Sequence, residues 1–313
     1  MNAPITTVAA RLPETRAGAA FAAAAELGDI MKPTQVRSGL WGLIYRHPAV
    51  AFGGGLLLIM AFLGIFAAYL GTLDPTALAT SQRTRAPSAA HWFGTDMLGR
   101  DIYSRVLFGA RISLAVGLSV AVLGSLIGLA LGLVSGMVRG LDGVIMRVMD
   151  GMMSIPPILL AITLMALTRG SLGNVIAAIT LAEIPRVTRL VRGVVLSLRE
   201  QPYVDAAVAA GTRMPMIIVR HILPNTLAPL TVQATYLCAS AMIVESILSF
   251  IGAGIPPTTP SWGNIMAEGR ALWQAKPFIV FFPAAFLSIT VLAVNMLGDG
   301  LRDALDPRMA KRL

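Results

Sequence analysis

Three carboxylates stand in long apolar stretches of the sequence, where charge is rare and each group needs a reason to be present. They are Asp150, Glu183 and Glu245. In a nonpolar solvent such groups line a polar pathway, relay protons or pair with another charge. Glu183 stands three residues before Arg186, a spacing that favours pairing along one helix. Glu245 has no basic neighbour in the sequence, so we expect it to line a pathway or to pair across helices.

The remaining reactive residues do not assemble into a catalytic pattern. His47, His91 and His221 are scattered over predicted loops, and Cys238 is the single cysteine. They predict no zinc cluster and no acid/base pair at one depth. The glycine-rich run 53–58 lacks the lysine of a nucleotide-binding loop. We therefore expect neither an enzyme nor a chain that binds a metal or a cofactor itself.

The composition indicates a membrane protein. Of 313 residues, 56% are hydrophobic and 13% charged, with a mean hydropathy of +0.73, whereas soluble domains carry about 25% charged residues. The formal net charge is +9. Because the basic residues cluster between apolar segments, they favour a membrane surface over nucleic acid as the partner.

Apolar stretches close to the length of a membrane-spanning helix recur along the chain. The fold class predicted is therefore all-α, a polytopic membrane protein with about six transmembrane helices. Asp150, Pro156 and Pro157 interrupt the third stretch, and Pro185 enters the fourth, so we expect both to be irregular. The six stretches are 48–71, 112–136, 148–168, 172–192, 226–251 and 277–298.

The distribution of basic residues predicts that both termini are cytoplasmic, because 17 of the 25 fall on that side of a six-span topology. The inner set is Arg11, Arg16, Lys32, Arg37, Arg46, Arg139, Arg147, Arg186, Arg189, Arg192, Arg199, Arg213, Arg220, Arg302, Arg308, Lys311 and Arg312. The outer set is Arg83, Arg85, Arg100, Arg105, Arg111, Arg169, Arg270 and Lys276. The Ala-rich tract 17–25 is followed by acidic residues, which indicates a cytoplasmic tail rather than a cleaved signal peptide.

Small residues recur at helical spacing in the second stretch. Gly124, Gly128, Gly132 and Gly136 are four residues apart and form one ridge almost free of side chains, which predicts close approach of another helix.

Two short helices joined by a turn are predicted between residues 199 and 225. Pro202 suits a first turn, Gly211 a C-terminal stop and Thr212 the cap of the second helix, which we expect to end before Pro224. One face of the first helix carries only small side chains, which can enter a cleft of another protein. That face is formed by Ala206, Ala207, Ala210 and Gly211.

The run Asp205-Ala-Ala, then Gly211, then Leu223-Pro224 resembles the EAA loop of permease subunits of bacterial ABC importers. Two positions depart from the general pattern, Asp205 in place of Glu and His221 in place of Ile. The sequence around His221, Arg220-His-Ile-Leu-Pro-Asn225, is similar to the dipeptide, oligopeptide and nickel branch.

Further runs between Arg46 and Arg308 resemble that branch, and the long loop after the first span is similar to the C-type half of its permease pair. These runs are Phe93-Gly-Thr-Asp-Met-Leu-Gly-Arg-Asp101, Gly109-Ala-Arg-Ile-Ser113, Leu190-Val-Arg-Gly193, Ser261-Trp-Gly-Asn264 and Leu297-Gly-Asp-Gly-Leu-Arg-Asp-Ala-Leu-Asp-Pro307.

The resemblance implies a multi-pass protein of the bacterial inner membrane that alternates between inward-facing and outward-facing states. Its expected partners are a homologous B-type permease, two ATP-binding subunits that use ATP and Mg, a periplasmic substrate-binding protein and membrane lipid. The implied regions are a cytoplasmic tail at 1–45, a first span with its periplasmic loop at 46–111, the permease domain at 112–300 with the coupling loop 199–225, and a cytoplasmic tail at 301–313. An ion-gradient-driven secondary transporter is the alternative, but the internal repeats expected of that class are not visible.

Two motifs of the outer loops also have a physical interpretation. Asp96, Arg100, Asp101 and Arg105 are three to five residues apart, which predicts an interfacial helix with pairs along its surface. The run 261–263 places a tryptophan where an aromatic anchor at the outer membrane interface is expected, near the surface for a substrate-delivering protein.

Overall fold

The computed structural model describes residues 47–305, and this part of the chain is helical, with one isolated bridge between Thr95 and Asp101. The all-α prediction is confirmed. The predicted tails at 1–45 and the end of the 301–313 tail lie outside the described residues. In chain order the elements are α3 (Pro48–Ile65), η1 (Ala67–Tyr69), η2 (Thr80–Gln82), α4 (Ile102–Met137), α5 (Arg139–Met153), α6 (Pro157–Leu167), α7 (Leu172–Arg199), α8 (Pro202–Ala209), α9 (Met214–Ile217), η3 (Ile218–Ile222), α10 (Leu223–Phe250), α11 (Trp262–Gly269), η4 (Arg270–Leu272) and α12 (Phe278–Leu305).

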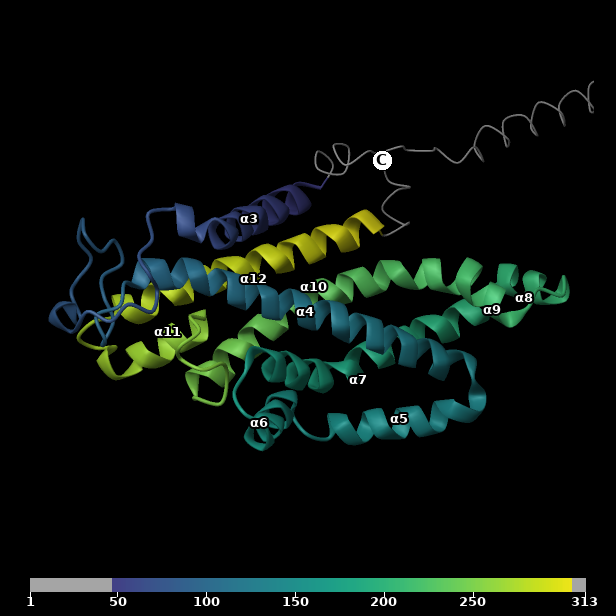
Figure 1. Cartoon of the computed structure of the whole chain (residues 1–313). Coiled ribbons are helices and arrows are strands. Elements are labelled where there is room, and N and C mark those ends of the chain that lie inside the picture. Colours follow the sequence, from purple (N-terminus) through teal and green to yellow (C-terminus); the bar gives the residue numbers. More distant parts are fainter. Residues whose placement is uncertain (1–46, 306–313) are drawn as a thin grey trace, which may run out of the picture. The chain divides into compact units, whose positions relative to one another are not determined.

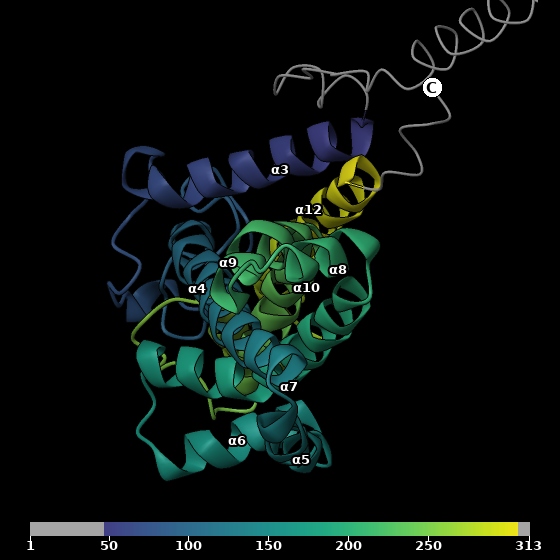
Figure 2. The same cartoon turned by 90° about the vertical axis from the view of Figure 1, so that its right-hand side faces the viewer.

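The long helices lie side by side in one bundle, with α8 and α9 at one end and α11 at the other (Figure 1). We call these the α8 end and the α11 end. Val50 at the start of α3 lies against Gly300 near the end of α12, so the two limits of the described chain lie beside each other, and both point toward the α8 end (Figure 1). Figure 2 looks onto that end, with α3 crossing one side of the bundle and α5 and α6 on the opposite side.

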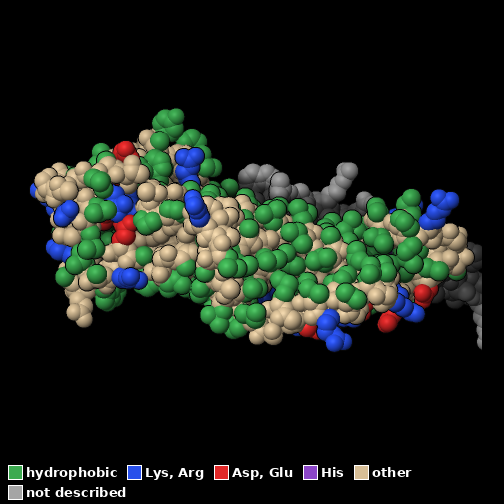
Figure 3. Space-filling view, turned by 60° about the horizontal axis from the view of Figure 1, so that its bottom comes forward, with side chains coloured by type: hydrophobic (Ala, Val, Ile, Leu, Met, Phe, Trp, Pro, Cys, Tyr) green, Lys and Arg blue, Asp and Glu red, His purple; other side chains and the backbone are tan. Residues whose placement is uncertain are grey.

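Four described helical segments are long and apolar enough to cross a membrane: α3, α4, the run Met214–Phe250 and α12. The pair α5 and α6 makes a fifth if it is one broken span, bent by 86°. The prediction of about six spans also counted α7, which has 28 residues but carries Glu183 and several arginines. A hydrophobic surface separates charged side chains at the two ends of the view in Figure 3, as expected of a bundle surrounded by lipid.

Element boundaries differ from the predicted stretches where a cap or a proline decides them. The second stretch begins at Ile102 instead of 112, because the Asp101 side chain accepts a hydrogen bond from the Ser104 backbone N–H at 2.8 Å and caps the helix. The predicted division at residue 111 therefore falls inside one continuous helix. The third stretch starts earlier, at Arg139, and breaks before Pro157, which opens α6.

The glycine ridge of α4 lies against α7 and α10. A Cβ built on Gly128, Gly132 or Gly136 would come within 2.6 Å of a valine side-chain atom of α7, and one on Gly124 within 2.7 Å of Leu237 of α10. Because real Cβ atoms do not approach so closely, glycine is what allows these helices to touch. The ridge brings the centre of α4 against the helix that carries Glu183.

Candidate functional site

The helix α8 at the end of the bundle is shaped by its first and last residues. Pro202 occupies its first turn, and Gly211 follows its end with φ of +78°, a left-handed conformation that glycine adopts without strain. The N–H of Thr212 donates to the Ala207 carbonyl at 3.0 Å and the N–H of Gly211 to the Val208 carbonyl at 2.9 Å. This pair of bonds is a Schellman motif, so the predicted helix stop at Gly211 is present.

The small residues of α8 are divided between two environments. Ala206, Ala210 and Gly211 are exposed, as is Asp205. Ala207 is half-buried and packs against the main hydrophobic core of the bundle. The exposed part of the predicted small-residue face therefore consists of Ala206, Ala210 and Gly211, while Ala207 anchors the helix.

Exposed apolar side chains surround these small residues at the α8 end. Val208, Met214 and Met216 each expose more than half of their surface, and Tyr203 exposes 42%. A group of exposed apolar side chains on a loop outside the bundle is typical of a protein contact surface.

The second short helix differs from its prediction. It begins at Met214 after Arg213, and Thr212 does not cap it. It also does not end before Pro224, because the π-helical segment Ile218–Ile222 carries it into α10 without a break. Leu223 and Pro224 thus open α10. A wider π turn eases the clash that a proline ring makes with the preceding turn.

Side chains bind the carbonyls that this irregular turn leaves available. Asn225 donates from Nδ2 to the His221 carbonyl at 2.6 Å, and the Thr226 hydroxyl donates to the Ile222 carbonyl at 2.8 Å. The chain from α9 into the spanning helix α10 is therefore a continuous hydrogen-bonded rod.

Charged groups join α4, α5 and α7 close to α8. Arg192 donates to Asp142 through two nitrogens at 2.5 and 2.7 Å, and Ser135 donates to the same carboxylate at 2.6 Å. Arg199 donates to the Gly136 carbonyl at 2.6 Å. A cavity of about 470 Å³ beside these groups reaches Asp205 of α8. Sequence reasoning missed Asp142; a carboxylate six residues after Gly136, the last glycine of the predicted ridge, was the available signal.

The predicted intramembrane carboxylates lie in three different settings. Glu183 is 3% exposed, 3.1 Å from Arg186 Nη1, and accepts from the Ser240 hydroxyl at 3.3 Å. Asp150 is exposed on α5 and accepts from Arg189 of α7 at 2.6 Å. The sequence-local pairing expected of Glu183 and Arg186 is thus seen.

Glu245 is fully buried inside the bundle. It accepts from the Ser249 hydroxyl at 2.8 Å, one turn further along α10, and Ser246 lies at 3.5 Å. The hydroxyls of Ser113 and Ser261 face the same carboxylate. We expected no local partner, but serine at helical spacing supplies one, and the group is not on the surface of this chain.

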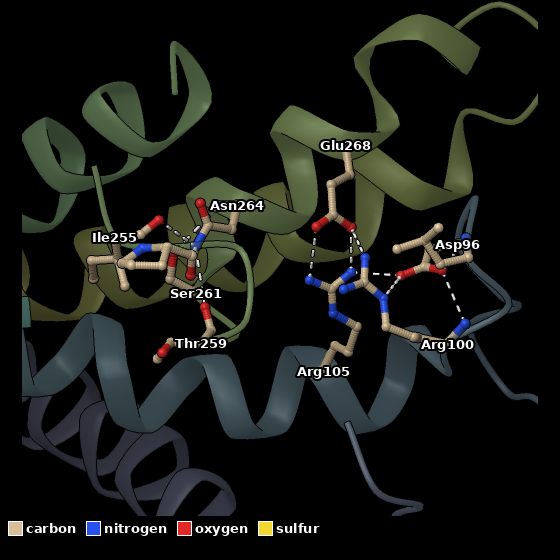
Figure 4. A network of polar contacts seen from close by, with 10 residues as sticks. Asp96, Arg100, Arg105, Ile255, Thr259, Ser261, Asn264 and Glu268 are labelled. Atoms are coloured by element: carbon tan, nitrogen blue, oxygen red, sulfur yellow. Dashed lines mark hydrogen bonds and ion pairs between the residues drawn. The ribbon is translucent and has the colours of Figure 1, made fainter. Parts of the chain in front are cut away.

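A buried ionic network ties the loop before α4 to α11 (Figure 4). Asp96 accepts from Arg100 Nε at 2.7 Å and from Arg105 Nη1 at 2.6 Å. Both arginines also donate to Glu268 of α11. The interfacial helix predicted from these spacings is wrong for residues 96–101, which form a turn closed by the Asp101 bridge to Thr95.

Trp262 is not the exposed interfacial anchor expected from the sequence. It is fully buried, and its indole nitrogen donates to the Val106 carbonyl of α4 at 3.0 Å. Asn264 closes the preceding loop by donating to the Ile255 and Thr259 carbonyls, each at 3.1 Å (Figure 4). The 261–264 run therefore fastens α11 to α4.

Among the described residues, no three histidine, cysteine or carboxylate side chains lie close enough together to hold a metal ion. The arrangement found instead is a membrane bundle with one exposed helix at its end. The family profile "Binding-protein-dependent transport system inner membrane component" matches residues 124–311, which include that helix. The chain belongs to this family. It is a transport permease component, not a catalytic subunit.

Alignments with similar proteins cover most of the permease. It is 54% identical over 267 residues to a probable peptide ABC transporter permease protein of Sinorhizobium fredii, covering 85% of this chain and 91% of that one. It is 45% identical to a dipeptide transport system permease protein of Alkalihalophilus pseudofirmus, covering 82% and 85%. It is 43% identical to a glutathione transport system permease protein of Salmonella typhimurium, covering 90% and 94%.

The fold also occurs in a solved transporter. The permease matches a chain of the inward-facing MetNI methionine ABC transporter with a TM-score of 0.54 and 22% identity, covering 64% of this chain and 96% of that chain. At this identity the likeness concerns the fold.

Proposed function

We propose that this permease forms half of the translocation pathway of an ATP-driven importer for peptides or a related small solute. The names of its relatives, which concern peptides, dipeptides and glutathione, support this cargo class. A homologous B-type permease forms the other half, two ATP-binding subunits use ATP and Mg, and a periplasmic binding protein delivers the cargo. The pair alternates between inward-facing and outward-facing states.

The observation that carries the proposal is the exposed helix α8. Ala206, Ala210 and Gly211 give its exposed surface a part that carries only small side chains, and Ala207 fixes the helix to the core. An ATP-binding subunit whose cleft receives α8 would move the α9–α10 rod and, through Arg199, the ends of α4 and α7. This is the coupling site, with Asp205 on α8 and with Leu223 and Pro224 at the start of α10.

This proposal places the α8 end and both termini in the cytoplasm, and the α11 end in the periplasm. The described limits of α3 and α12 lie beside each other and point toward the α8 end, which supports one common side for them. Reporter fusions at about residues 205 and 310 should read cytoplasmic, and fusions at about 85 and 262 periplasmic. An external signal at 205 would contradict the coupling assignment.

The test of coupling uses the exposed positions of α8, because Ala207 is half-buried and Gly211 has a left-handed backbone. Ala206→Glu and Ala210→Arg should insert and pair with the sister permease, yet release the ATP-binding subunits on purification and abolish uptake. An unpaired charge in a packed contact costs several kcal/mol, and about 3 kcal/mol weakens docking more than a hundredfold.

The matched control is Ala275→Glu, an equally exposed alanine at the α11 end. It should keep the ATP-binding subunits and normal uptake. If Ala206→Glu and Ala210→Arg also keep both, then α8 is not the coupling site.

A further inference from the structure

A half-exposed arginine stands at the centre of the bundle, where it is costliest. Arg186 is near the midpoint of α7, roughly 20 Å from either end at 1.5 Å per residue. Its side chain exposes 38% of its surface. A guanidinium at this depth that faced lipid would be strongly unfavourable, so this face of the bundle borders water or another polar surface.

Arg186 differs from the next two arginines of α7. Arg189 and Arg192 follow at helical spacing, and each has a carboxylate of α5 within 2.6 Å, Asp150 and Asp142 respectively. Arg186 receives none from α5. Its ion partner in the described part of the chain is Glu183, at 3.1 Å, and its Nη1 makes no hydrogen bond of good geometry there.

An aromatic ring fixes the position of this guanidinium. Its central carbon lies 5.3 Å from the centre of the Tyr236 ring, a cation–π distance. Tyr236 is near the midpoint of α10 and 51% exposed. One turn before it, the Gln233 amide nitrogen is buried without a hydrogen-bond partner among the described residues. Arg186 Nη1 and Gln233 Nε2 are thus buried nitrogens without a hydrogen bond among the described residues, on two helices that meet at the Arg186–Tyr236 contact.

The chemistry of these donors selects the ligand. A guanidinium has five N–H groups in a planar fork, and two parallel ones match the oxygens of a carboxylate. With one contact made to Glu183, the fork of Arg186 retains this capacity on its exposed side.

We propose that Arg186 binds the carboxylate of a peptide halfway along the pathway, with Tyr236 holding the guanidinium in place. The assignment rests on the proposed import function and adds a cargo contact to it. Glu183 keeps Arg186 from being an unpaired charge when no cargo is present.

The first test asks whether Arg186 faces the pathway. Cys238 is the sole cysteine, so Cys238→Ala gives a cysteine-free background for Arg186→Cys. In vesicles carrying the assembled transporter, a charged, impermeant methanethiosulfonate should modify that variant in the nucleotide-free or the ATP-trapped state. Leu58→Cys, on the apolar and 72% exposed part of α3, should not react. Failure of Arg186→Cys to react in both states would overturn the proposal.

The second test measures radiolabelled dialanine delivered per ATP hydrolysed, in proteoliposomes with the complete transporter and its loaded binding protein. Arg186→Gln should lower this ratio about tenfold or more, since hydrogen bonds to charged groups are the strong ones. Arg186→Lys should lose less. Arg189→Gln removes the next arginine along α7, which is paired with Asp150. This variant should lower the ratio less than twofold.

The outcomes separate this inference from the import proposal. If the wild-type transporter carries dialanine and Arg186→Gln carries it equally well, the cargo contact is wrong and the import function stands. An equal loss in Arg189→Gln would also overturn the contact, as would release of the sister permease by Arg186→Gln, which would make Arg186 an interface residue. No dialanine transport by the wild type would contradict the cargo class itself.

Discussion

The ion pairs at the two ends of α4 differ in how deeply they are buried. At the α11 end, Asp96 and Arg105 are almost completely buried and pair with each other. Arg100 also pairs with Asp96, and both arginines pair with Glu268. At the α8 end, Asp142 and Arg192 keep 26% and 30% of their side chains exposed. The first end is closed by contacts within the chain, whereas the second leaves its groups and the α8 surface open to water or a partner.

The contrast shows at which end the chain supplies all the ion partners of its own charged groups. A buried charge is strongly destabilising unless an oppositely charged partner is buried beside it, so every member of the ionic network at the α11 end is needed. Exposed pairs are worth little and can be rearranged. An end built from such pairs can follow a moving partner, as a coupling site requires.

The largest effect is expected from breaking the buried network. Arg105→Met would leave Asp96 and Glu268 with only Arg100 between them and should destabilise the protein by about 3–5 kcal/mol. Denaturant titration in detergent would measure the loss. Arg83→Met, on the loop before α4 and exposed, should change stability by less than about 0.5 kcal/mol. Equal stability of the two variants would remove the contrast between the ends.

An intermediate effect is expected at the glycine ridge of α4. Gly132→Val would place a Cβ 2.6 Å from that of Val191 and 2.9 Å from the Thr188 carbonyl oxygen, and overpacking of this kind costs about 1–3 kcal/mol. Gly143→Val in α5 has nothing within 4 Å of the added atom. The same titration should find the second variant close to wild type. A loss of similar size in both would mean that the ridge contact is unimportant.

The smallest effect is expected at the α8 end. Asp142→Asn removes the charge opposite Arg192, and because both groups are partly exposed the loss should be about 1 kcal/mol or less. Its unfolding midpoint should therefore stay near that of wild type. A loss as large as that of Arg105→Met would show that this end is locked as firmly as the other.

Local features of the sequence predicted much of the fold. Apolar runs located the long helices, glycines every four residues marked the ridge of α4, and Gly211 marked the stop of α8. Each of these signals arises from neighbours along the chain, so spacing alone reveals it. The short helix α8 was predicted in the same way, and its proposed coupling role came from the EAA resemblance.

Contacts between distant segments were missed for the same reason. Arg100 and Glu268 are 168 positions apart, and no periodicity connects them. Trp262 is the residue type of an interfacial anchor, yet packing against α4 buries it. The continuous path through Pro224 was missed because the sequence rule for proline assumes an α-helical turn, whereas the chain forms a π turn there.

That π turn sets the angular phase of α10. Each residue advances an α-helix by roughly 100°, and a π turn takes up one residue more than an α turn. Every side chain of α10 is therefore rotated by roughly a quarter to a third of a turn from where an uninterrupted α-helix starting at Met214 would place it. The segment Ile218–Ile222 therefore sets how the side chains in the middle of the bundle are rotated relative to those at the α8 end. It decides that Tyr236, and not a neighbour in the sequence, stands beside α7.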